Sequence, residues 1–202
     1  MNNKVLILLV ALLTASALPS SGQDGYWVIE AGIGSSTFDR SGGNAEISGT
    51  GSSREYSSGE RTVSYHSSPV VLPTFAVSGG YKFGDSFVGL FLNVYGNFAW
   101  SNLDGGPAPL KEKETILHVL PEVRMYYMDT PNLKLFAAAG AGFRYRQFTE
   151  TLEGDAISNS DFRFSWQFAP FGVSIGEHWH FTVATGYGRP WTGCFLSGGY
   201  RF

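Results

Sequence analysis

Two of the four histidines lie near a serine or an acid in a way that could support catalysis. His66 lies two residues before Ser68 in the segment YHSS, near acids such as Glu60. A histidine base beside a serine, oriented by a carboxylate, is the arrangement that nucleophilic catalysis uses. His118 lies four residues before Glu122, which puts both side chains on one face of a strand. We expect His66 to be an exposed loop histidine and His118 to form hydrogen bonds in a polar core.

The other two histidines could bind a metal ion. His178 and His180 lie two residues apart in the segment EHWH, and Glu177 precedes them as a third potential zinc ligand. No further histidine is close in sequence, and a single cysteine, Cys194, cannot form a cysteine-based cluster. We therefore predict a turn with polar side chains, no metal site and no bound cofactor.

Arg144 and Arg146 lie two residues apart in the otherwise apolar segment AAAGAGFRYRQF. In a strand, residues of one parity share a face, so Gly140, Gly142 and both arginines would face one way and the alanines and aromatic residues the other. In a helix the two arginines would point about 200° apart, because each residue turns by about 100°. The segment is therefore predicted to be a strand with one charged face and one apolar face.

The same alternation recurs along the chain and predicts eight strands. They cover residues 26–36, 72–83, 86–100, 115–127, 133–148, 162–175, 179–188 and 194–202. Short turns at 84–86, 129–132 and 176–179 alternate with mostly longer loops at 37–71, 101–114, 149–161 and 189–193. In an antiparallel meander this puts all the long loops at one end, as in outer-membrane barrels. The loop 37–71 is rich in serine and glycine and is expected to have a mobile tip, and Pro170 indicates a β-bulge.

Alternation alone does not say which face points outward, because a soluble lipocalin-like barrel also has eight strands and two faces. The small residues lie on the polar face, which suits the crowded interior of an eight-stranded barrel. Aromatic residues gather near both strand ends, where they prefer the membrane interfaces. They are Tyr26, Trp27, Tyr81, Tyr127 and Trp179 on the turn side, and Trp100, Trp166 and Trp191 on the loop side. We predict an all-β fold, an eight-stranded antiparallel up-and-down transmembrane β-barrel, with the soluble ligand-binding barrel as the alternative.

The N-terminus has the pattern of an exported protein. A lysine, a short apolar run and then small residues are typical of a secretory signal peptide, and the run is too short to span a bilayer as a helix. Cleavage after Gly22 is favoured over cleavage after Ala17, so we predict a signal peptide at 1–22 and an outer-membrane β-barrel domain at 23–202. Charged residues make up 15% of the chain, below the roughly 25% of soluble domains, and no basic tract indicates nucleic-acid binding.

The last residues carry a resemblance to a known class of proteins. The chain ends in FLSGGYRF, with Tyr200 and Phe202 on one face, and this ending resembles the C-terminal strand of bacterial outer-membrane β-barrel proteins. In length and layout the mature chain is similar to the small eight-stranded barrels of the OmpA/OmpX type. The resemblance implies the outer membrane of a Gram-negative bacterium, with extracellular loops and both termini periplasmic. It also implies two partners, the outer-membrane lipids and the barrel-assembly machinery, which reads Tyr200 and Phe202.

Polar residues of inward parity are expected to form a network inside the barrel. On the lipid face an arginine would cost about 2–4 kcal/mol at the membrane midplane. Six basic side chains of this face have only two acidic partners, Glu30 and Glu122. The remaining positive charges would be compensated by water, by amides or by loop acids such as Glu150, Glu153 and Asp155. The predicted network consists of Glu30, Lys82, Asn93, Asn97, His118, Glu122, Arg124, Arg144, Arg146, Arg163, Gln167 and Arg201. We interpret it as a structural plug, with an anion-attracting site as the alternative.

The sequence favours a non-enzymatic protein with a structural or surface-interaction role, with the loop 37–71 binding an extracellular ligand. The alternatives are a lipid-modifying enzyme and a narrow pore for small solutes. The spacing of His66 and Ser68 loosely resembles that of lipid A deacylases. An enzyme would bring a serine, a histidine and an acid together near one rim, and alanine at His66 or His118 would abolish its activity.

Overall fold

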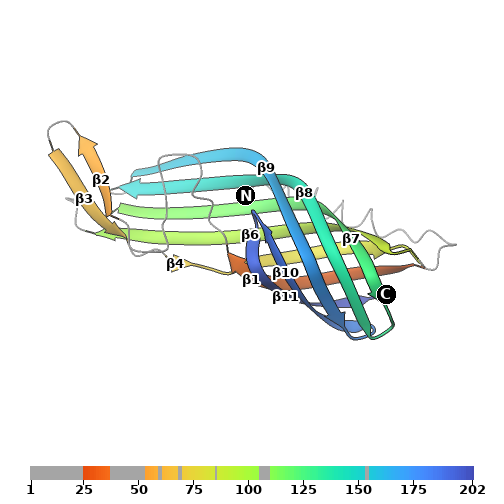
Figure 1. Cartoon of the computed structure of the whole chain (residues 1–202). Helices are drawn as coiled ribbons and strands as arrows, with labels where there is room; N and C mark the ends of the chain where they lie inside the picture. The colour runs from red at the N-terminus through yellow and green to blue at the C-terminus, as the bar shows by residue number, and fades with distance from the viewer. Residues whose placement is uncertain are drawn as a thin grey trace.

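The structure, a computed structural model, describes residues 25–36, 53–58, 61–67, 70–84, 86–104, 110–152 and 155–202. Eight of its strands form a closed antiparallel barrel (Figure 1): β1 (Tyr26–Ser36), β5 (Thr74–Lys82), β6 (Val88–Asp104), β7 (Leu110–Asp129), β8 (Leu133–Leu152), β9 (Asp155–Ile175), β10 (Trp179–Gly188) and β11 (Trp191–Arg201). Consecutive barrel strands pair with each other, and β1 pairs with β11 to close the circle. Closure satisfies backbone groups that an open edge would expose to lipid. The predicted transmembrane β-barrel is confirmed.

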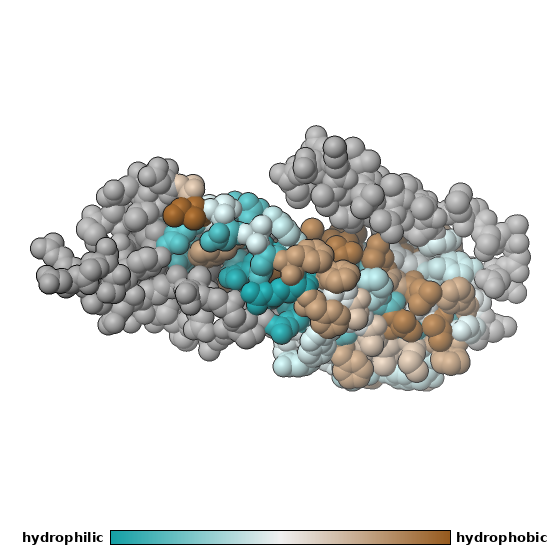
Figure 2. Space-filling model, turned by 90° about the horizontal axis from the view of Figure 1, so that it is seen from above, coloured by the Kyte–Doolittle hydropathy of each residue, from teal (hydrophilic) through white to brown (hydrophobic). Residues whose placement is uncertain are grey.

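The apolar face of the barrel points outward. Along β6, Leu90 and Phe98 are exposed whereas Asn93 and Asn97 are buried, although all four lie in the same strand. Figure 2 shows the apolar residues gathered over the barrel, with polar residues beside them toward the far ends of the long strands. An inward apolar face, as a lipocalin-like barrel requires, is therefore wrong for this chain.

Two aromatic residues of the predicted girdles point into the barrel instead. Tyr26 shares its face with Val28 and Glu30, and its ring lies 4.9 Å from Nζ of Lys134. Trp191 begins β11, three residues earlier than predicted, and is buried with its ring 5.3 Å from that of Phe195. Other girdle residues, such as Trp179, Tyr127 and Trp100, are exposed on the outer face as expected.

Four strands are much longer than membrane crossing requires. The strands β6, β7, β8 and β9 have 17 to 21 residues, whereas β1, β5, β10 and β11 have 9 to 11, and about 9–11 tilted residues span a bilayer. We call the surplus the extension; it comprises residues 98–104, 110–117, 145–152 and 155–166. The predicted loops 101–114 and 149–161 are therefore wrong over most of their length. Their many charged residues are typical of a loop, but over 111–114 exposed and buried side chains alternate as in the rest of β7.

The first long loop also contains strands. The hairpin of β2 (Ser53–Ser58) and β3 (Arg61–Ser67) joins the edge of β6 through the pair His66 and Asp104, and β4 (Val70–Val71) pairs with β6 as well. These residues of the loop 37–71 are strands because their valine, threonine and tyrosine favour strands despite the many serines. The remainder of the loop lies outside the described residues.

The bulge predicted at Pro170 is confirmed. Between Ala169 and Gly172, β9 has one more residue than the facing stretch of β8, and the register with β10 shifts at the same place. Pro170 and Phe171 consequently both point outward. Because of this extra residue, the polar side chains of β9 point inward again in the part of the strand that follows Phe171.

Candidate functional site

The centre of the barrel is crossed by an ion network around Arg124. Its guanidinium lies 2.8 Å from Glu30 and 2.9 Å from Glu122, and packs 3.8 Å from the centre of the Phe91 ring. All of these side chains are buried. One buried cation thus compensates two buried carboxylates, which is the condition under which such charges are tolerated.

Glu30 extends this network across the barrel. Its carboxylate lies 2.9 Å from Nε2 of His180 and accepts hydrogen bonds from Ser78 and Thr182, each at 3.3 Å. Together with Arg124, these partners tie β1, β5, β7 and β10 to one carboxylate. An internal cavity of about 30 Å³ borders this centre, which is room for about one water molecule.

A second cluster closes the turn end. Asp129 lies 2.7 Å from Nζ of Lys82 and also pairs with Lys134. Arg201 donates to Ser174 and to the backbone carbonyls of the 176–177 turn. Asp129 is the last residue of β7, at the turn end of the strand. Burial raises the pKa of its carboxyl, but the hydrogen bonds from Lys134 and Lys82 outweigh burial and hold the pKa below its ordinary value.

The loop end is closed by neutral polar groups. Asn97 donates to Thr74 at 2.6 Å and to the carbonyl of Pro190 at 2.9 Å, and Thr74 donates to the same carbonyl at 2.8 Å. The β10–β11 turn is thereby held in the barrel mouth. Asn93 and Gln167 are also buried on this inner face.

A histidine and a serine meet near the rim. Nδ1 of His118 lies 2.8 Å from Oγ of Ser165, but both residues are almost fully buried. Among the described residues, Nε2 of His118 has no hydrogen-bond partner, so no acid orients this ring. The side chain of His66 lies outside the described part. The structure therefore brings together a Ser–His pair, without the carboxylate that a triad uses.

The remaining arginines of the predicted network lie on the inner face nearer the loop end of the barrel. Arg146 pairs with Glu114, and Arg163 lies 2.6 Å from Asp161. Arg144 is buried, whereas the side chain of Arg163 is 43% exposed. Arg163 thus lies above the closed barrel, at the base of the extension.

Several partners in these clusters are absent from the predicted network. They are Glu114, Asp129, Lys134, Asp161 and His180. Glu114 and Asp161 were assigned to loops, and Asp129 to a turn. The signal that could have found Glu114 is its parity, which it shares with His118 and Glu122. Of the loop acids proposed as partners, Glu153 and the side chain of Asp155 lie outside the described part.

The histidines considered as zinc ligands point to different places. His180 is buried against Glu30, whereas His178 stacks on Tyr200 at 6.0 Å between ring centres. In the part of the chain that the structure describes, no group of three histidine, cysteine or acidic residues could hold a metal ion.

Comparisons with known proteins agree with this architecture. The chain is similar to the crystal structure of Ail, the attachment invasion locus protein of Yersinia pestis, with a TM-score of 0.52, 13% identity, and coverage of 89% of this chain and 99% of that chain. The N-terminal β-barrel domain of Pseudomonas aeruginosa OprF gives a TM-score of 0.40 and 13% identity, covering 90% of this chain and 100% of that chain. A comparison with curated proteins finds no match. A family model described as the outer membrane protein beta-barrel domain matches residues 5–197, and the chain belongs to this family of bacterial outer-membrane proteins.

Proposed function

We propose that the protein is a non-enzymatic outer-membrane barrel that binds extracellular partners through its extension. The observation that carries the proposal is the length of β6 to β9, which exceeds what membrane crossing requires. The β2–β3 hairpin adds to the same sheet at β6. A paired, multi-stranded sheet holds its side chains in place and so provides a preorganised binding surface.

The interior supports a structural role. The network of Arg124, Glu30 and Glu122 crosses the lumen, and the cavity beside it has room for only about one water molecule. The Ser–His pair is buried and lacks an orienting acid among the described residues. These features favour a plugged barrel over a pore or a lipid-modifying enzyme.

The proposal includes an orientation. The extension and the long loops face the exterior, whereas the turns and both termini of the mature chain face the periplasm. Residues 1–22 act as the signal peptide, and Tyr200 and Phe202 are read by the barrel-assembly machinery. In the membrane, the outward apolar side chains contact the outer-membrane lipids.

A strand-shortened variant tests the function. Trp100 pairs with Lys113, and Gln147 pairs with Ser160, so residues 101–112 and 148–159 can each be replaced by an Asn-Gly turn without changing register. Cells that display the full chain are expected to bind members of a panel of immobilised glycans and matrix proteins, and cells with the shortened variant are expected to lose this binding. Equal binding by both cell types would contradict the proposal.

Surface labelling provides the control for this test. In a Cys194→Ser background, Gln147→Cys should react with a membrane-impermeant maleimide on intact cells. Asn132→Cys, at the opposite turn, should react only after permeabilisation. The reverse pattern would invert the proposed orientation.

A further inference from the structure

We propose that His118, Arg144 and Arg163 form a binding site for a tetrahedral oxyanion, a phosphate or sulfate group, at the base of the extension. The inference rests on the proposed function and deepens it, because it names the chemical class of ligand that the inner face of the extension binds.

The three residues lie directly opposite one another on neighbouring strands. Arg144 of β8 is in register with His118 of β7 on one side and with Arg163 of β9 on the other. Directly opposed side chains have Cβ atoms about 4.5–5.5 Å apart, and like charges in this position destabilise a sheet. Asp161 already pairs with Arg163, and an anion between the strands would add a contact that both guanidiniums share.

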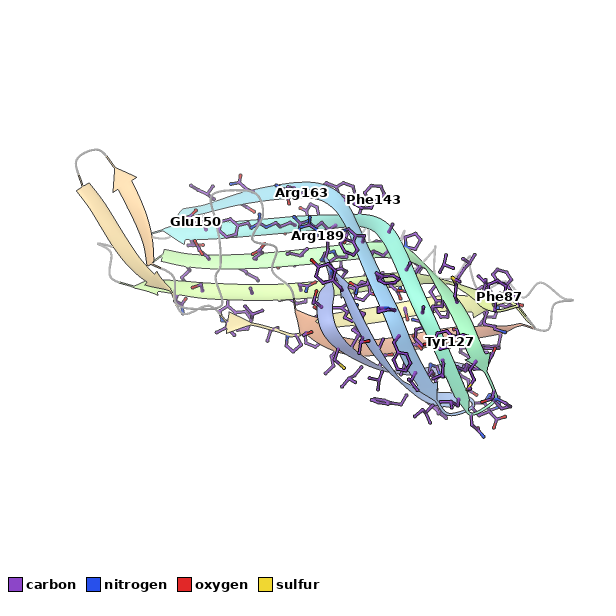
Figure 3. All side chains as sticks on the ribbon, viewed as in Figure 1. Phe87, Tyr127, Phe143, Glu150, Arg163 and Arg189 are labelled. Atoms are coloured by element: carbon purple, nitrogen blue, oxygen red, sulfur yellow. The ribbon has the colours of Figure 1, made fainter. Side chains whose placement is uncertain are left out.

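Arg144 and its charged neighbours together carry a net positive charge. The electrostatic neighbours of Arg144 are the guanidiniums of Arg163 and Arg146 and the carboxylates of Asp161 and Glu114. The cluster thus has three positive and two negative charges, a net charge of +1. The backbone of Arg189 lies beside β9, because its N–H donates to the carbonyl of Trp166 at 3.0 Å. Figure 3 shows Arg163 and Arg189 at this junction of barrel and extension.

His118 supplies an independent observation. Its ring is buried, with 1% of the residue exposed, and Nε2 has no hydrogen-bond partner among the described residues. Buried polar atoms are normally hydrogen-bonded. When Ser165 donates its hydroxyl proton to Nδ1, the neutral ring carries its proton on Nε2. This N–H can donate to an anion held opposite, beside Arg144.

The cluster is reachable from the loop side. The side chain of Arg163 is 43% exposed and that of Asp161 is 29% exposed, whereas Arg144 lies deeper. A guanidinium forms two parallel hydrogen bonds with phosphate or sulfate oxygens, which a chloride ion cannot accept in this way. The geometry therefore favours an oxyanion over a halide.

Calorimetric titration of the purified protein in a phosphate-free zwitterionic detergent tests the site. Inorganic phosphate and inorganic sulfate are each titrated at an ionic strength kept constant with chloride. Saturable binding is expected for the unmodified chain, and Arg163→Gln should weaken it by about tenfold or more, because a hydrogen bond to a charged group contributes about 1.5–3 kcal/mol. Lys113→Gln removes the same charge from the exposed outer face of the same sheet and should leave binding unchanged.

The outcomes separate this inference from the proposed function. Absence of saturable binding to the unmodified chain, or equal weakening in Lys113→Gln, would overturn the oxyanion site even if cells still bind through the extension. Glucose 6-phosphate and micelles that contain phosphatidic acid distinguish a soluble ligand from a lipid head group. Binding of either one that Arg163→Gln weakens identifies the source, and binding of neither restricts the site to free inorganic phosphate or sulfate.

Discussion

Arg124→Met is expected to lower the free energy of unfolding by about 3–5 kcal/mol, the cost of removing one partner from a buried ion pair. The guanidinium of Arg124 lies within 3 Å of both Glu30 and Glu122, and the substitution leaves two buried carboxylates without their cation. Urea unfolding of the protein folded into lipid vesicles, followed by tryptophan fluorescence, measures the change.

Two further variants show whether this loss comes from the charges. The triple variant Glu30→Gln, Glu122→Gln and Arg124→Met removes both carboxylate charges and should be more stable than Arg124→Met alone. Lys113→Met removes an exposed cation and should change the free energy of unfolding by at most about 0.5 kcal/mol. A loss of less than about 1 kcal/mol in Arg124→Met would show that the central network does not hold the barrel together.

Val77→Arg is expected to destabilise the folded barrel by about 2–4 kcal/mol, the cost of an arginine on the lipid face near the bilayer midplane. Val77 lies in the middle of β5, is 51% exposed, and pairs with Ala31 and Val94. The same unfolding measurement in lipid vesicles detects this loss.

Gln147→Arg is the matched control for Val77→Arg. It introduces the same side chain at an exposed position with outward parity, but in the extension. Its effect should stay within about 0.5 kcal/mol, as for ordinary surface substitutions. Similar losses at both positions would mean that the outer face of β5 does not lie in lipid.

The number of barrel strands and the direction of their faces could be predicted from alternation, whereas the strands β2, β3 and β4 in the first long loop could not. In β6, for example, Leu90 and Asn93 differ in parity and therefore point to opposite sides, as the structure shows. Parity describes one strand at a time, and this is why the face assignment succeeds without any knowledge of which strands lie side by side. The assignment fails for Tyr26 and Trp191 near strand ends. Both are aromatic residues of the kind found in membrane girdles, but their parity is that of the inward face.

The ends of the strands and the pairings within the lumen could not be predicted in the same way. Glu114 lies in a highly charged segment that composition assigns to a loop, yet it belongs to β7. The contact between His180 and Glu30 depends on the register of β10 and β1 on either side of β11, because both residues lie opposite Gly199 of that strand. No local sequence pattern encodes such a contact, because it follows from closure and from the stagger of the strands.

Electrophoresis in SDS of outer-membrane fractions, with and without boiling, tests the closed membrane barrel most directly. We expect a band that appears only in the detergent-extracted membrane and changes its mobility when the sample is heated, because the closed strand ladder resists SDS until it is boiled. A band with the same mobility before and after heating, found in the soluble periplasmic fraction, would contradict a closed barrel whose apolar face lies in lipid.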